Sequence, residues 1–163
     1  MIRFTLVTHK KDLELIERMA EEIWREHYTP IIGNEQVEYM LDKFQSAQSM
    51  QKQIEEGYTY ILINSDQEAL GYLAYEKRDN ALFLSKIYLL KRVRGKGYGK
   101  LAMHHVFESA KDLGCRSIRL TVNRFNLNSI MAYERIGFEK KGEVVQDIGN
   151  GFVMDDYVME KEL

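Results

Sequence analysis

The sequence is poor in residues on which several common kinds of site depend. Cys115 is its only cysteine, which excludes an intrachain disulfide and a cysteine-based zinc site, and we expect no metal. No apolar run approaches the roughly 20 residues that span a bilayer. The first residues lack the long apolar core and the cleavage site of a signal peptide. We therefore expect a cytoplasmic protein that does not act in a membrane.

Strong charge and linker segments are also missing. The formal net charge is -2, so no strong field draws the chain to nucleic acid or to an anionic membrane. Pro30 is the only proline, and no repeat, low-complexity tract or Gly/Ser-rich linker interrupts the sequence. The hydrophobic fraction of 45% is enough for a packed core. These features predict a single domain over residues 1–163.

Hydrophobic periodicity predicts a mixed sheet with helices on its faces. Alternation with period two indicates strands, and apolar residues at helical spacing indicate helices. The predicted strands are 2–7, 58–64, 70–77, 81–90, 117–122, 138–148 and 152–160. The predicted helices are 12–28, 34–56, a helix that runs from a glycine-rich loop to Gly114, and 127–136.

The connections between these elements set the topology. Pro30 and Gly33 are expected to end the first helix, and Asn34 to act as the N-cap of the second. Short polar turns at 65–68 and 78–80 predict an antiparallel meander, and Gly149-Asn150-Gly151 predicts a hairpin. The order β-α-α-β-β-β-α-β-α-β-β indicates an α/β or α+β fold.

The most informative segment is the loop Arg94-Gly95-Lys96-Gly97-Tyr98-Gly99-Lys100, which joins a predicted strand to a predicted helix. Glycines let a backbone approach a ligand closely and adopt positive φ. The N–H groups at a helix start, together with the helix dipole, bind phosphate oxygens. Arg92, Arg94, Lys96 and Lys100 add positive charge. Taken alone, the glycines are equally consistent with a turn flanked by solvated lysines.

A second segment, 126–138, combines a polar cap, a tyrosine and a terminal Gly-Phe. Asn126 is the expected N-cap of this helix. Tyr133 lies three residues after Ile130 and three before Ile136, near the buried stripe. For an isolated tyrosine, a core position with a satisfied hydroxyl is the simpler interpretation.

Together the two segments resemble the GNAT superfamily of N-acetyltransferases. The loop fits the pattern Arg/Gln-x-x-Gly-x-Gly/Ala through Arg94, Gly97 and Gly99. The helix fits the pattern Asn-x-x-Ser/Ala-x-x-x-Tyr…Gly-Phe through Asn126, Ser129, Tyr133, Gly137 and Phe138. The resemblance implies a mostly antiparallel seven-stranded mixed sheet with helices on both faces. The long helical segment before the meander also loosely resembles the polyamine acetyltransferase branch.

The resemblance implies transfer of an acetyl group from acetyl-coenzyme A to a primary amine, by direct attack in a ternary complex. Tyr133 would be the general acid that protonates the coenzyme A thiolate. Strand backbone groups would hold the pantetheine arm and loop amides the pyrophosphate, while polar groups of the second helix would line the pantetheine. The implied cofactor-binding residues are Ile87, Tyr88, Leu89, Arg94, Gly95, Lys96, Gly97, Tyr98, Gly99, Lys100, Asn126, Asn128, Ser129 and Tyr133.

The general base is not assignable from the sequence. Many relatives use a carboxylate on the fourth strand, but 81–90 contains no Asp or Glu and carries Lys86 instead. Glu76 is the tentative base, and Glu22, His27 and a water chain are alternatives. Lys86 is either a satisfied lysine at the sheet edge or a group that repels cationic substrates. The final hairpin supplies further acidic residues, which could attract an amine or simply form a hydrophilic edge: Asp147, Asp155 and Asp156.

The sequence does not identify the amine acceptor or any partner protein. A small amine, a polyamine, a peptide amine and an antibiotic all fit the resemblance. A non-catalytic module that binds coenzyme A thioesters or another protein is the alternative function. The Met- and Tyr-rich terminal hairpin is a candidate for pairing in a homodimer.

Overall fold

The computed structural model describes residues 1–66 and 68–163. The chain divides into two compact units, and each unit uses separate stretches of sequence. Unit 1 contains 1–76 and 86–106, and unit 2 contains 77–85 and 107–163. Two strands, β3 and β4, and one helix, α5, therefore begin in one unit and end in the other. Of the predicted turn 65–68, Gln67 lies outside the described residues.

The predicted strands are confirmed, with boundaries that differ by at most two residues. The described residues form a seven-stranded sheet with the order β1-β2-β3-β4-β5-β7-β6. β4 and β5 pair in parallel, while the pairs β1–β2, β2–β3, β5–β7 and β6–β7 are antiparallel. The strands are β1 Ile2–Leu6, β2 Thr59–Ser65, β3 Glu68–Arg78, β4 Ala81–Leu89, β5 Ser117–Asn123, β6 Glu139–Gly149 and β7 Phe152–Glu162.

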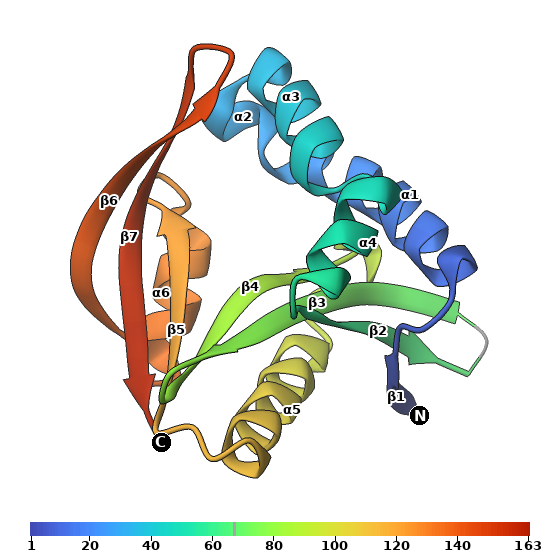
Figure 1. The fold of residues 1–163 in the computed structure, drawn as a ribbon, viewed down its shortest axis with the longest axis vertical. Coiled ribbons are helices and arrows are strands. Elements are labelled where there is room, and N and C mark those ends of the chain that lie inside the picture. The colour runs from blue at the N-terminus through green and yellow to red at the C-terminus, as the bar shows by residue number, and fades with distance from the viewer. Residues whose placement is uncertain (67) are drawn as a thin grey trace. The chain divides into compact units, whose positions relative to one another are not determined.

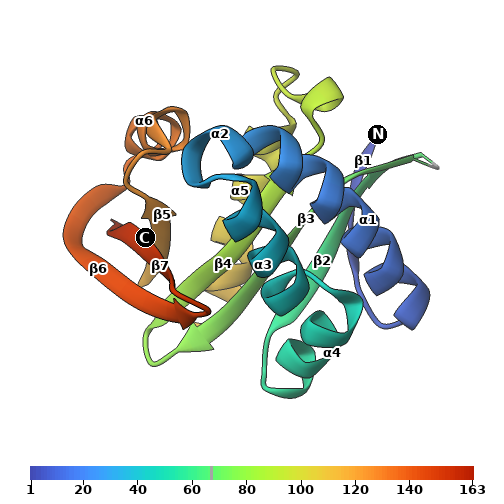
Figure 2. The ribbon, with the colours of Figure 1, turned by 90° about the horizontal axis from the view of Figure 1, so that it is seen from above.

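The helices of unit 1 cover the strands from two sides. α1, α3 and α4 lie along one side of β2 and β3, and the beginning of α5 lies on the other (Figures 1 and 2). The helices of the chain are α1 Lys10–His27, α2 Thr29–Ile32, α3 Asn34–Phe44, α4 Ala47–Glu55, α5 Tyr98–Asp112 and α6 Leu127–Arg135, with a 3-10 turn, η1, at Lys91–Val93.

The predicted apolar stripe of the first helix is confirmed. Its buried side chains recur every three or four residues, as a helix that faces a core requires. They are Leu13, Ile16, Met19, Ala20, Ile23 and Trp24. Fully burying one such leucine or isoleucine contributes about 1.5–3 kcal/mol, so this stripe fixes α1 against the remainder of unit 1.

The prediction of one continuous helix over 34–56 is wrong. The helix breaks at Gln45 and Ser46, and the Ser46 side chain caps α4 by accepting a hydrogen bond from the Ser49 N–H at 3.2 Å. Asn34 is the first residue of α3 and not its N-cap, a place taken by Gly33 at φ 87°. A glycine is suited to this backbone because positive φ carries no Cβ penalty.

Unit 2 contains a curved hairpin, β6–β7, beside β5 (Figure 2). The hairpin turn has positive φ at Gly149, Asn150 and Gly151, as the Gly-Asn-Gly sequence predicts. On β5, Ile118, Leu120 and Val122 are buried, and they alternate with the polar residues Arg119 and Thr121. One face of this strand is therefore apolar and the other polar.

Candidate active site

The glycine-rich loop lies in unit 1, between η1 and α5. Gly95 and Gly97 have φ values of 78° and 86°. A Cβ at either position would meet no atom within 4 Å, so the backbone conformation, and not a lack of space, calls for glycine. The Leu101 N–H donates to the Gly97 carbonyl at 3.3 Å, which makes this the first turn of the helix. The N–H groups of 98–100 precede it and point out of the helix start, as binding of phosphate oxygens requires.

Two of the four basic side chains around the loop are already in ion pairs. Arg94 donates to Glu26 at 2.9 Å and to the Leu89 carbonyl at 3.0 Å. Arg92 pairs with Glu68. Within the described part of the chain, Lys96 and Lys100 form no ion pair, and both are exposed. The positive charge available to an anionic ligand is therefore concentrated on these two lysines.

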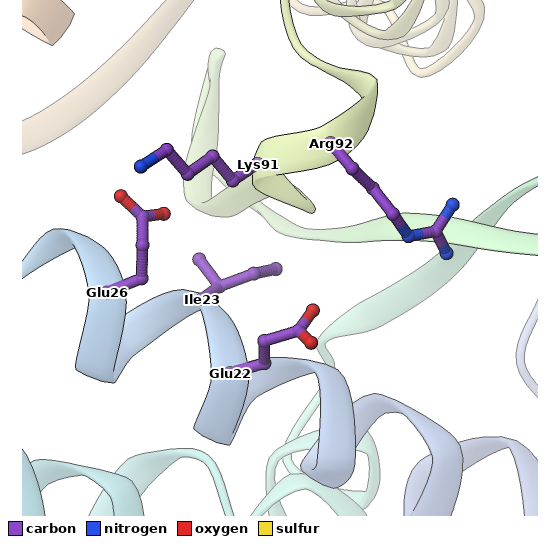
Figure 3. Close-up of a pocket in the computed structure, with 5 residues that line it drawn as sticks. All are labelled: Glu22, Ile23, Glu26, Lys91 and Arg92. Atoms are coloured by element: carbon purple, nitrogen blue, oxygen red, sulfur yellow. The ribbon is translucent and has the colours of Figure 1, made fainter.

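A cavity of about 570 Å³ lies next to the loop, between α1 and η1. Figure 3 shows Glu22, Ile23 and Glu26 on α1 facing Lys91 and Arg92 on η1. Glu22, one candidate base, thus lines a cavity of mixed charge. The acidic side chains of α1 here face basic residues of the chain itself.

The predicted pantetheine strand is packed closely against β3 at one position. A Cβ on Gly71 would lie 2.1 Å from the Tyr88 carbonyl oxygen and 3.0 Å from the Leu89 Cα. The Leu90 N–H donates to the Leu70 carbonyl at 2.9 Å. Only glycine allows this approach, and Gly71 was not recognised from the sequence. A glycine inside a strand pattern is the signal that points to such a contact.

Lys86 is buried in β4, with 6% of its surface exposed. Its ammonium donates to the Phe44 carbonyl at 2.6 Å, to Gln53 Oε1 at 3.1 Å and to the Tyr60 hydroxyl at 2.5 Å. Burial lowers the pKa of Lys86 to about 7. The hydrogen bonds of this lysine are satisfied, and the pairing of β4 with β5 covers Ala81–Phe83, ahead of Lys86.

Aromatic rings gather on the same side of β4 as Lys86. The Trp24 ring lies 4.3 Å from that of Tyr28 and 5.8 Å from that of Tyr88, and Tyr72 lies 5.4 Å from Tyr88. Trp24 is 4% exposed and therefore lies in the core. His27, another candidate base, contacts the Tyr28 ring at 4.8 Å.

Glu76, the tentative base, lies near the end of β3 and is half-buried. Its carboxylate is 4.0 Å from the place that a Cβ of Gly57 would occupy. It is thus near the turn that follows α4.

The second sequence motif lies in unit 2. Asn126 is at the N-cap position of α6, but its side chain makes no capping hydrogen bond, contrary to the prediction. Instead the residue is buried, and its backbone carbonyl accepts from the Ile130 N–H at 3.1 Å. Asn128 is exposed and Ser129 is half-buried. The Tyr133 ring packs edge-on against Phe138 with a centroid distance of 5.6 Å.

The remaining titratable residues are mostly structural. The His105 ring stacks on the Phe4 ring with a centroid distance of 4.5 Å. The pKa of His105 is lowered, mainly by burial and to a lesser extent by the nearby His104. Cys115 is buried. Among residues 1–66 and 68–163, no group of three or more His, Cys, Asp or Glu side chains is arranged to hold a metal ion. Over the same residues, no helix has the length and apolar character needed to cross a membrane.

Comparisons with known proteins agree with these motifs. A model of the Acetyltransferase (GNAT) family matches residues 16–138. Streptothricin acetyltransferase of Streptomyces lavendulae is 30% identical over 82 residues, 49% of this chain and 43% of that protein. Spermine/spermidine N(1)-acetyltransferase of Bacillus subtilis is 27% identical over 70 residues, 42% of this chain and 46% of that protein. The chain spans less than two thirds of the length of the curated relatives that it matches.

Solved structures support the fold. PaiA N-acetyltransferase from Thermoplasma acidophilum, in a structure that contains coenzyme A, matches with a TM-score of 0.85 at 22% identity. The match covers 100% of this chain and 99% of that one. The mixed sheet predicted from the sequence is therefore confirmed, and the solved N-acetyltransferase structure has the same fold.

Proposed function

Because the chain belongs to the GNAT family of acetyltransferases, we propose that it transfers an acetyl group from acetyl-coenzyme A to a primary amine. The observation that carries this proposal is the loop at the start of α5. Two glycines with positive φ, a helix start and two lysines without ion pairs suit a pyrophosphate. Acetyl-coenzyme A supplies an activated thioester.

The proposal assigns the remaining donor contacts to β4 and α6. Backbone groups of Ile87, Tyr88 and Leu89 hold the pantetheine arm as an added strand would. An N–H near Leu89 stabilises the negative charge that develops on the thioester oxygen. Asn126, Asn128 and Ser129 line the pantetheine. The tight contact of Gly71 with β4 supports the strand assignment, because it holds the Tyr88–Leu89 backbone in one position.

Tyr133 is the proposed general acid. A neutral phenol with an ordinary pKa near 10 can donate to a thiolate whose conjugate acid has a pKa of about 8–9. Replacing Tyr133 by phenylalanine keeps the ring packing on Phe138 and removes the proton. We expect kcat to fall by about 10²–10⁴-fold, with little change in acetyl-coenzyme A affinity.

A calorimetric titration with acetyl-coenzyme A tests the donor half of the proposal. We expect saturable binding to the wild-type protein and to Tyr133→Phe. Gly97→Val forces a β-branched residue into positive φ and should abolish binding of acetyl-coenzyme A. Gly142→Ala on β6 is the control and should leave this binding unchanged. Absence of binding to the wild-type protein would end the proposal.

The amine is proposed only as a class. The relatives named above act, by their names, on streptothricin and on spermine or spermidine. These compounds and a peptide with an N-terminal alanine form a suitable first acceptor panel. Glu76, Glu22 and His27 remain candidate bases from the sequence, and none of them lies in a position that singles it out.

A further inference from the structure

An ion pair joins α1 to the first residue of the glycine-rich loop. Arg94 Nη1 donates to Glu26 Oε1 at 2.9 Å, and both residues belong to unit 1. Since only 35% of the Arg94 side chain and 31% of the Glu26 side chain is exposed, solvent screens this pair incompletely. The two residues are 68 positions apart, so the contact ties the loop to an element outside its own strand–turn–helix segment.

The same guanidinium also reaches the end of β4. Arg94 Nε donates to the Leu89 carbonyl at 3.0 Å, and the Arg94 backbone N–H donates to the Lys91 carbonyl at 3.2 Å. A planar guanidinium makes both side-chain bonds at once because its N–H groups point in fixed, different directions. Arg94 therefore connects α1, the end of β4 and η1 immediately before Gly95.

The elements that Arg94 contacts are held firmly by the remainder of unit 1. On α1, Trp24 is 4% exposed. Just beyond β4, the Leu90 N–H donates to the Leu70 carbonyl at 2.9 Å. The loop begins with a residue that has no such packing, since a Cβ on Gly95 would meet no atom within 4 Å. Arg94 is therefore the place where the packed part of unit 1 meets the loop.

The ion pair also limits what the charge of Arg94 can do. A carboxylate at 2.9 Å compensates the guanidinium, whereas Lys96 and Lys100 form no ion pair within the described part of the chain. Movement of the guanidinium toward a phosphate would break its bonds with Glu26 and the Leu89 carbonyl. Charge-assisted hydrogen bonds of this kind are among the stronger ones in proteins. The contacts therefore favour a positioning role for Arg94 over direct binding of the pyrophosphate.

We propose that Glu26 is a positioning residue for acetyl-coenzyme A, an inference that rests on the proposed acetyl transfer. Glu26 holds Arg94, and through Arg94 it holds the start of the loop in the shape that binds the pyrophosphate. Electrostatics alone predicts the opposite effect, because a carboxylate near a phosphate-binding loop repels an anionic ligand and its removal tightens binding. The sign of the change in affinity therefore separates the two roles.

Calorimetric titration of Glu26→Ala and Glu26→Gln with acetyl-coenzyme A measures this sign. Glu26→Ala should weaken binding by about three- to fivefold, because Arg94 loses its acceptor on α1. Glu26→Gln keeps an oxygen that accepts from Arg94 and should recover most of the affinity. Glu21→Ala is the matched control, because Glu21 lies on the same helix but pairs with Arg25 at 2.9 Å. This control should bind acetyl-coenzyme A as the wild-type protein does.

Arg94→Lys provides a second measurement. It keeps the positive charge but loses the planar group that reaches Glu26 and the Leu89 carbonyl together, so binding should weaken to a similar extent. Three results would each overturn the role of Glu26 while the acetyl transfer stands: tighter binding by both Glu26 variants, equal affinities of these two variants, or wild-type affinity of Arg94→Lys. Absence of binding to the wild-type protein would overturn both.

Discussion

Two buried ionisable side chains of opposite charge, Lys86 in unit 1 and Asp156 in unit 2, have very different surroundings. Lys86 donates to three acceptors, so each of its ammonium hydrogens has a partner. Gln53, which accepts from Lys86 and from Tyr60, also donates to the Phe44 carbonyl at 3.2 Å. This network is complete without a ligand. It connects β4 to the junction of α3 and α4, so we assign Lys86 a structural role.

Asp156 has a hydrogen bond with Thr121 and a like charge, Asp155, beside it. Burial, and then Asp155, raise the pKa of Asp156 to about 6, whereas burial lowers the pKa of Lys86 to about 7. The comparison teaches that burial shifts the pKa of either charged group toward its neutral form, whatever its sign.

The largest effect on stability should come from the backbone contact that supports β4. Gly71→Ala would place a methyl group 2.1 Å from the Tyr88 carbonyl oxygen, and backbone atoms cannot move away cheaply. We expect the free energy of unfolding to fall by about 3 kcal/mol. Gly142→Ala on β6, where a Cβ meets nothing within 4 Å, should change it by less than about 0.5 kcal/mol. Urea unfolding of both variants makes the measurement, and equal stabilities would refute the close contact.

Burial of Lys86 predicts a rise in stability at alkaline pH. The pKa of Lys86 is lowered from 10.5 to about 7, so between these values the unfolded chain holds a proton that the folded protein has released. The free energy of unfolding therefore rises with pH in this window, by at most about 1.4 kcal/mol per pH unit. Lys86→Met should remove the rise. A wild-type protein of constant stability from pH 7 to 10 would show that Lys86 is not buried as described.

Asp156 predicts the opposite slope in an acidic window. Its pKa is raised from 3.8 to about 6, so between these values the folded protein holds a proton that the unfolded chain has lost. Its contribution is fully present below the lower value and is lost as the pH rises through about 6. Asp156→Asn should flatten this fall relative to wild type, whereas Glu160→Gln should leave it in place. A series of unfolding curves from pH 4 to 7 makes the comparison.

The smallest expected effect concerns the lysines of the loop. Lys96→Ala and Lys100→Ala should each weaken acetyl-coenzyme A binding by up to about tenfold and reduce its dependence on salt, because exposed charges are screened. Lys91→Ala, at the cavity between α1 and η1, is the matched basic control and should have less effect. Equal losses in all three variants would contradict the assignment of the phosphate contact to the loop.

Local patterns predicted the strands and the long helices because these depend on alternation and on caps within the chain. The break at Gln45–Ser46 was not predicted, because residues 34–56 favour helix throughout. In the folded protein the Phe44 carbonyl instead accepts hydrogen bonds from Lys86 and Gln53. The pairing of Arg94 with Glu26 joins residues 68 positions apart and has no local signature. The need for glycine at position 71 was not predicted for the same reason, because the strand that contacts Gly71 follows later in the sequence.

Two parts of the candidate site, the glycine-rich loop and the Asn126–Phe138 segment, were predicted from sequence motifs. The general base was not, because the burial and the contacts of each candidate carboxylate appear only after folding. Asp156 was named in the sequence merely as one of three acids on the terminal hairpin. Its neighbour Asp155 has the same residue type, yet Arg124 neutralises it.

The most direct test of the account is release of coenzyme A thiol from acetyl-coenzyme A in the presence of the acceptor panel. We predict amine-dependent thiol release with at least one acceptor, reduced by about 10²–10⁴-fold in Tyr133→Phe at unchanged donor affinity. Tight binding of acetyl-coenzyme A without thiol release from any amine would contradict the account, and would identify the chain as a non-catalytic binding module.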